Sequence, residues 1–161
     1  MIYDLQRQRF IRAQEHSYST ALGEIQNGRK ESHWMWYIFP QLLGLGKSVT
    51  AKYYAIHGIE HARAYLEDEL LGTRLIEVSQ VLLDSPSGNA VEIFGSTDSM
   101  KLQSCMTLFH AAKPGDSVFQ KVLVRFFGGF PDQRTLGLIG NETYKGGYSH
   151  SVESAWGWLE V

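Results

Sequence analysis

Apolar residues recur along this chain at the three- and four-residue spacing of α-helices, not at the alternate positions of half-buried strands. Five such stripes stand out: Tyr18, Ala21, Leu22 and Ile25; Ile59, Ala62 and Leu66; Leu71, Leu75, Val78 and Leu82; Leu102, Cys105, Met106 and Phe109; and Phe119, Val122, Leu123 and Phe126. No alternating run is long enough to predict a sheet beyond a hairpin. The pattern therefore predicts an all-α protein.

Residues that commonly end or cap helices stand between the stripes. The breaks are Asn27 with Gly28, the loop 85–89, and Gly128 with Gly129; the N-cap candidates are Ser48 and either Ser96 or Thr97. The helix after Ser48 is expected to carry Val49, Tyr53 and Ile56 on one face. Short helices joined by short loops indicate a compact globule of several short helices.

The helical pattern stops after Gly140. We therefore expect a helical domain over residues 1–140 and a tail of uncertain order over 141–161. The tail carries Trp156 and Trp158, so it is either loosely ordered or docked by its indoles on the main domain or on a second copy. A chain of 161 residues is long enough to bury a sizeable core as one domain.

Composition excludes several classes of partner. Apolar residues make up 43% of the chain and charged residues 20%, which are ordinary globular values. A net charge of -2 provides no basic field for nucleic acid. No apolar run approaches the roughly 20 residues of a membrane span, and the N-terminus lacks the apolar region of a signal peptide. We expect no nucleic-acid or membrane partner and a cytoplasmic location; the oligomeric state is not indicated.

Two short motifs suggest chemistry that their surroundings do not support. The sequence GLGKS, residues 44–48, resembles the end of a phosphate-binding loop, but Gln41 stands where that motif needs its first glycine. We expect a turn that leads to the Ser48 cap. The sequence HGIEH has the spacing of some zinc peptidases, but Gly58 weakens a helix between His57 and His61 and no third ligand is evident. We expect a helix boundary with two solvated histidines, and no metal.

Cys105 lies on an apolar stripe, where a cysteine usually serves as a small hydrophobic residue. As the single cysteine of the chain, it also excludes an internal disulfide framework and a multi-cysteine zinc site.

Two segments carry a resemblance to a known family. They are SHWMWYIFPQ, residues 32–41, and DSMKLQSCMTLF, residues 98–109, within a similarity that covers about 5–138. The chain resembles the bacterial family named domain of unknown function 1810. The resemblance implies a compact all-α fold and no established activity.

The same two segments hold the candidate site residues. Polar side chains beside buried aromatic rings must be hydrogen-bonded or lie at the edge of a cavity. Asp98 and Lys101 are one helical turn apart, with Ser104 on the same flank. If the segments meet, they form a concave site for a small anionic or nucleotide-like ligand, lined by Arg29, Ser32, His33, Trp34, Trp36, Gln41, Asp98, Lys101 and Ser104.

Other interpretations of these residues stay open. They can form a purely structural polar network, with Asp98 in a first helical turn and Lys101 as its surface partner. The protein is then a non-catalytic helical interaction module. Whether it is an enzyme is not decided by the sequence. If it is, His33 is the best candidate for a catalytic acid or base, because histidine ordinarily titrates near neutral pH. The cofactors are unknown.

Overall fold

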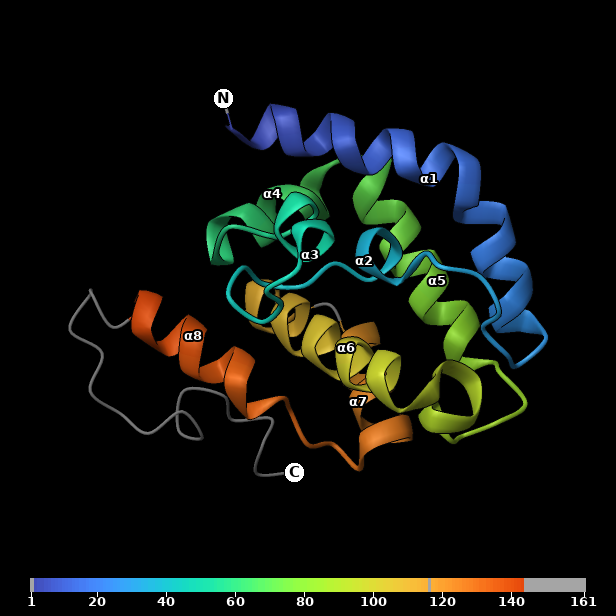
Figure 1. Ribbon diagram of the computed structural model, residues 1–161. Coiled ribbons are helices and arrows are strands. Elements are labelled where there is room, and N and C mark those ends of the chain that lie inside the picture. Colours follow the sequence, from blue (N-terminus) through green and yellow to red (C-terminus); the bar gives the residue numbers. More distant parts are fainter. Residues whose placement is uncertain (1, 116, 144–161) are drawn as a thin grey trace.

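The computed structural model describes residues 2–115 and 117–143. Within these ranges the chain forms eight α-helices and no strand (Figure 1), namely α1 (Ile2–Gln26), α2 (Met35–Ile38), α3 (Val49–Tyr53), α4 (Ile59–Glu67), α5 (Leu71–Leu83), α6 (Ala90–Ala112), α7 (Ser117–Phe127) and α8 (Gln133–Thr143). The all-α prediction is confirmed. The described part also has one isolated parallel bridge, between Leu42 and Ile56.

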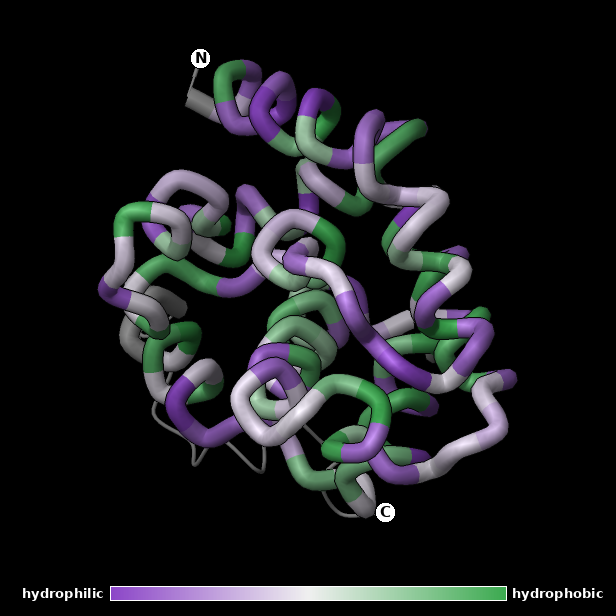
Figure 2. The backbone as a smooth tube through the Cα atoms, turned by 45° about the vertical axis from the view of Figure 1, so that its right-hand side comes forward, coloured by the Kyte–Doolittle hydropathy of each residue, from purple (hydrophilic) through white to green (hydrophobic). Residues whose placement is uncertain are grey.

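Helix α6 lies in the middle of the fold. It packs against α4, α7 and α8, while α5 packs against α1, α4 and α7. The second part of α6 is almost fully enclosed, since every residue from Ser104 to Ala112 is buried. Figure 2 shows the hydrophobic positions gathered on the inner helices, while α1 alternates between hydrophobic and hydrophilic residues. The core therefore forms around α6.

The first half of α1 was not predicted, and its buried face explains why. Gln6 and Gln14 are each 2% exposed and point inward with Phe10. The Gln6 amide donates to the carbonyl of Ala55 at 3.3 Å, and the Gln14 amide donates to the carbonyl of Tyr37 at 2.9 Å. Because polar side chains fasten this half of the helix, it shows no apolar stripe.

Helix α6 is broken at Gly95. This residue has φ 82° and ψ 165°, a conformation that favours glycine. The sequence predicted a helix capped by Ser96 or Thr97. Instead, α6 begins earlier, at Ala90, and Asn89 is its N-cap, accepting from the N–H groups of Val91 and Glu92. Ser96 and Thr97 directly follow the break at Gly95. Just before the break, the carbonyl of Ile93 accepts from the N–H of Lys30 at 2.7 Å, and this bond joins the stretch after α1 to α6.

Residues 44–48 form a turn that leads to the Ser48 cap, as the sequence predicted. Ser48 caps α3 by accepting from the N–H of Ala51 at 3.0 Å, as predicted. A Cβ atom at Gly46 would lie 2.6 Å from the Ala51 side chain and 3.1 Å from Trp36, so the glycine permits close packing. The predicted face of this helix was wrong, because α3 ends at Tyr53 and Val49 is 84% exposed. Ile56 is buried beyond the helix through its bridge to Leu42.

The histidine pair was predicted correctly only in part. Gly58 is the N-cap of α4, so the helix boundary is confirmed. His57 is exposed, but His61 is only 3% exposed, so the expected solvation of His61 was wrong. The cause is the packing of α4 on α1, which stacks the His61 ring on Tyr3 with centroids 4.4 Å apart.

The remaining expectations concern the C-terminal part of the chain, membrane spans and metal ions. Helix α8 runs to Thr143 and so crosses residue 140. The tail with Trp156 and Trp158 lies outside the described residues. Within the described ranges, none of the helices combines the length and the apolar character needed to cross a membrane. The same ranges contain no cluster of three or more His, Cys, Asp or Glu residues suited to a metal ion.

Candidate functional site

A buried carboxylate organises the start of residues 32–41, which we call the aromatic segment. Glu24, in the last turns of α1, accepts from the N–H of Glu31 at 2.7 Å, from the N–H and hydroxyl of Ser32 at 2.9 and 2.6 Å, and from the indole nitrogen of Trp34 at 2.9 Å. Burial raises the pKa of Glu24, but these hydrogen bonds outweigh it and lower the pKa to about 2. The hydroxyl of Ser32 and the indole N–H of Trp34 are therefore hydrogen-bonded within the fold.

A second carboxylate joins the two predicted segments. Asp98, in the second part of α6, forms ion pairs with Lys30 at 2.8 Å and with Lys101 at 3.0 Å. Lys30 lies over the Trp34 ring at 5.0 Å and Lys101 over the Trp36 ring at 4.1 Å. Burial raises the pKa of Asp98, but the two lysines lower it below the ordinary value. The expected pairing of Asp98 with Lys101 and the meeting of the segments are both present.

The side chains of Arg29 and His33 lie apart from this cluster. Both residues are exposed. The backbone of His33 takes part in the fold, since its carbonyl accepts from the Tyr37 hydroxyl at 3.2 Å. Neither residue is among those that line the pocket beside Trp36. Of the neighbouring cations Arg29 and Lys30, it is Lys30 that forms an ion pair with Asp98.

A pocket of about 180 Å³ opens between α2, α6 and α8. One face of α6 supplies Thr97, Met100, Lys101 and Ser104, at helical spacing, and the rest of the lining comes from Trp36, Gln41, Leu45, Gly46, Asp132 and Arg134. We call this the Trp36 pocket. It contains four of the predicted site residues, namely Trp36, Gln41, Lys101 and Ser104.

Gln41 is the unusual member of the Trp36 pocket. It is 7% exposed, and among the described residues no hydrogen-bond acceptor lies within reach of its Nε2. A buried amide without a partner costs free energy, so native proteins rarely keep one. Ser104 differs, because its hydroxyl already donates to the carbonyl of Met100 at 3.1 Å. The Nε2 of Gln41 is therefore a buried donor that the described residues leave without an acceptor.

Two charged residues of the Trp36 pocket were not identified from the sequence. Arg134 donates to the carbonyl of Leu45 at 3.2 Å and so ties α8 to the loop before α3. Asp132 caps α8, accepting from the N–H and hydroxyl of Thr135 at 2.9 and 2.6 Å. An Asp placed three residues before a threonine, just after Pro131, was the signal for a helix start that could have revealed α8.

Comparison with known proteins agrees with this fold. A similar solved structure is that of the conserved hypothetical protein Rv1873 from Mycobacterium tuberculosis, which is 41% identical, with a TM-score of 0.83 over 87% of this chain and 99% of that chain. No curated protein matches the sequence. Residues 3–139 match the family described as "Protein of unknown function (DUF1810)", nearly the span of the resemblance found in the sequence. The chain therefore belongs to the DUF1810 family.

Proposed function

We propose that the protein binds a small anionic ligand in the Trp36 pocket, through a carboxylate or phosphate group. The observation that carries the proposal is the unpartnered Nε2 of Gln41, on a side chain that is 7% exposed and lines the pocket. An acceptor atom from a ligand would satisfy this donor, whereas an empty pocket leaves only water to do so.

The charges around Gln41 favour an anion, because Lys101 and Arg134 outnumber Asp132 in the lining of the pocket. Lys101 uses one ammonium hydrogen for Asp98, and its remaining hydrogens are available to a ligand. Arg134 gives one terminal nitrogen to the carbonyl of Leu45 and retains other donors. Charge-assisted hydrogen bonds from such groups to carboxylates and phosphates are stronger than neutral ones.

The size of the pocket limits what enters it. Pockets for drug-sized ligands usually occupy about 300–1,000 Å³. At about 180 Å³ the Trp36 pocket suits a single anionic group with a few neighbouring atoms. Lys101 also covers one face of the Trp36 ring, so a planar base cannot stack there. We therefore place the anionic group inside the pocket and any larger remainder of the ligand outside.

The test is a titration of ¹⁵N-labelled protein with acetate, inorganic phosphate and adenosine monophosphate, followed by nuclear magnetic resonance. The Gln41 side-chain amide is expected to shift in a saturable manner with at least one of the three. Acetate, phosphate and the nucleotide separate a carboxylate site, a phosphate site and a site that also needs the nucleoside.

Variants distinguish the pocket from general charge effects. Gln41→Leu and Lys101→Met should each weaken binding about ten-fold, the effect of one hydrogen bond to a charged group. Lys52→Met removes an exposed lysine on α3 as a matched control, and His33→Ala tests the histidine that the sequence favoured. Both should leave binding unchanged. If no probe saturates, or if Gln41→Leu binds as well as the wild type, the proposal fails and the interaction-module hypothesis is preferred.

A further inference from the structure

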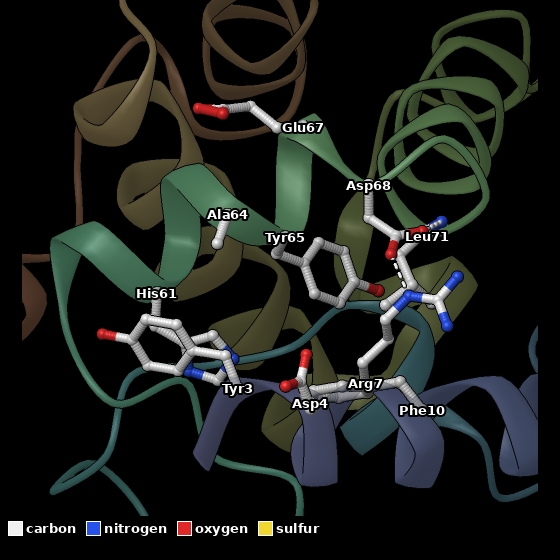
Figure 3. A pocket seen from close by; sticks show the side chains of 10 residues that line it. All are labelled: Tyr3, Asp4, Arg7, Phe10, His61, Ala64, Tyr65, Glu67, Asp68 and Leu71. Atoms are coloured by element: carbon white, nitrogen blue, oxygen red, sulfur yellow. Dashed lines mark hydrogen bonds and ion pairs between the residues drawn. The ribbon is translucent and has the colours of Figure 1, made fainter. Parts of the chain in front are cut away.

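A second cavity, of about 320 Å³, lies between the N-terminal part of α1, helix α4 and the start of α5 (Figure 3). It is lined by Tyr3, Asp4, Arg7, Phe10, His61, Ala64, Tyr65, Glu67, Asp68 and Leu71, and it shares none of these with the Trp36 pocket. Its volume lies within the usual range of ligand pockets. We call it the His61 cavity.

His61 presents a defined hydrogen-bond donor to this cavity. Its Nδ1 accepts from the N–H of His57 at 2.8 Å, so the proton of the neutral ring is on Nε2. Burial, followed by the nearby His57, lowers the pKa of His61 to about 4, which keeps the ring neutral at physiological pH. The side chain is 3% exposed and lines the cavity, and its hydrogen bond within the described residues is made through Nδ1.

Tyr65 presents a second donor one turn further along α4. Its hydroxyl oxygen accepts from the Gln14 amide at 3.1 Å, and its own hydrogen has no acceptor within the described part of the chain. Tyr65 is 4% exposed, so bulk water does not readily serve this hydrogen. Residues 61 and 65 are four apart on one helix, so both side chains line the cavity, and the Tyr65 hydroxyl points toward the Arg7–Asp68 end (Figure 3).

The walls of the cavity are aromatic. The Tyr3 ring stacks on His61 at an interplanar angle of 8°, and Phe10 meets Tyr65 edge-on with centroids 5.2 Å apart. Figure 3 shows the His61 and Tyr3 rings at one end and the Arg7–Asp68 pair at the other, with Tyr65 between them. A ligand with a planar apolar body would bury more of these walls than water does.

The charges disfavour an anion here. Asp68 is already satisfied, because it accepts from Arg7 and from the N–H groups of Leu70 and Leu71. Arg7 is thus partnered. Glu67 adds negative charge to the lining. An anionic ligand would approach against this charge, whereas an uncharged one pays no such penalty.

We propose that the His61 cavity is a binding site for a small, uncharged, planar carbonyl compound, such as an aromatic amide. Its carbonyl oxygen accepts from the Tyr65 hydroxyl, while its ring lies against the aromatic walls beside His61. This site is separate from the Trp36 pocket and does not depend on the function proposed for it.

The experiment compares benzamide, benzoate and benzylamine, which share a ring but differ in charge. Binding is measured by saturation-transfer nuclear magnetic resonance and by the shift of the His61 imidazole nitrogens during titration. Benzamide should bind most tightly and should shift the His61 signals. Tightest binding of benzylamine or benzoate, or no saturable binding of benzamide, would overturn the proposal.

Variants locate the binding in the cavity. Tyr65→Phe removes one donor without changing the ring and should weaken benzamide about five-fold. Tyr18→Phe removes a hydroxyl that donates to the Arg74 carbonyl, outside the cavity, and should have no effect. Ala64→Leu, at an exposed position of α4, should block the cavity while leaving both donors in place. Unchanged benzamide affinity in Tyr65→Phe or in Ala64→Leu contradicts the proposal.

Discussion

The Glu24 carboxylate accepts a hydrogen bond from the Trp34 indole at 2.9 Å, and this contact fastens the aromatic segment to the end of α1. Trp34 is 1% exposed and packs edge-on against Phe94, with centroids 6.2 Å apart. The hydrogen bond and the ring contact together place the segment against the first part of α6. The position of the Trp36 pocket depends on that placement.

Replacing Glu24 with glutamine should destabilise the protein by about 2–4 kcal/mol, because a neutral amide cannot accept all four donors and turns its own N–H groups toward some of them. Denaturant unfolding measures the change. Glu31→Gln is the control, since that side chain is exposed, and it should stay within about 0.5 kcal/mol of the wild type. Equal effects of the two substitutions would show that the Glu24 network does not carry the stability.

Stability should fall in acid in two stages. The pKa of His61 is lowered from 6.5 to about 4 by burial and then by His57, and that of His110 is lowered to about 4 by burial. The unfolded chain therefore binds more protons below pH 6.5, and the stability from the neutral histidines is lost as the pH falls toward 4. Glu24 has a lowered pKa of about 2 against 4.5, so its contribution, present above pH 4.5, is lost toward pH 2.

His61→Asn tests the first stage, because the Asn oxygen can replace Nδ1 as acceptor for the His57 N–H without titrating. Each histidine contributes a slope of up to about 1.4 kcal/mol per pH unit, so the free energy of unfolding of this variant should change less steeply between pH 6.5 and 4. The measurement is denaturant unfolding at a series of pH values. An unchanged slope would mean that His61 does not titrate as described.

Gly72→Ala should destabilise the protein by roughly 1–3 kcal/mol or more. A Cβ atom there would lie 2.0 Å from the carbonyl oxygen of Leu66, so α4 and α5 would have to move apart. Gly23→Ala is the matched control, because nothing lies within 4 Å of its Cβ position in α1. That change should stabilise the helix by about 0.5–1 kcal/mol. Thermal unfolding of both variants shows whether the two substitutions change the stability in opposite directions.

Adjacent residues of the aromatic segment should differ sharply in their effect on stability. Trp34→Ala removes a fully buried ring and should cost about 3–5 kcal/mol. His33→Ala removes an exposed side chain and should change stability by less than roughly 1 kcal/mol. Chemical unfolding of the two variants is the check, and a large loss in His33→Ala would contradict the position described for that side chain.

The helices were predictable where apolar side chains make their buried face, as in α4, α5 and α7. The first half of α1 was not, because its inward positions are Gln6 and Gln14, whose amide nitrogens bond to groups 23 to 51 residues away in sequence. A single-sequence pattern cannot show that such a glutamine is satisfied inside a protein. The same limit concealed Glu24, which shares a buried helix face with Ala21 and Ile25.

The sequence named the meeting of residues 32–41 with residues 98–109 as the condition for a site, but it did not indicate which side chains would face that site. The stretch after α1 is not helical, so nothing in its spacing tells whether Arg29 or Lys30 points inward. The structure turns Lys30 to Asp98 and leaves Arg29 exposed. Arg134 comes from a helix that was not predicted, so its part in the Trp36 pocket could not be foreseen.

Asp98 pairs with two cations at once, so this cluster tolerates mutation of a lysine better than mutation of the aspartate. Loss of either lysine leaves a balanced pair of one acid and one base. Loss of the aspartate leaves Lys30 and Lys101, whose side chains are 9% and 19% exposed, with like charges and no counter-ion between them. A single substitution of either lysine should therefore lower the stability only modestly. Substitution of Asp98 is tolerated only in a chain in which one of the two lysines has already been replaced.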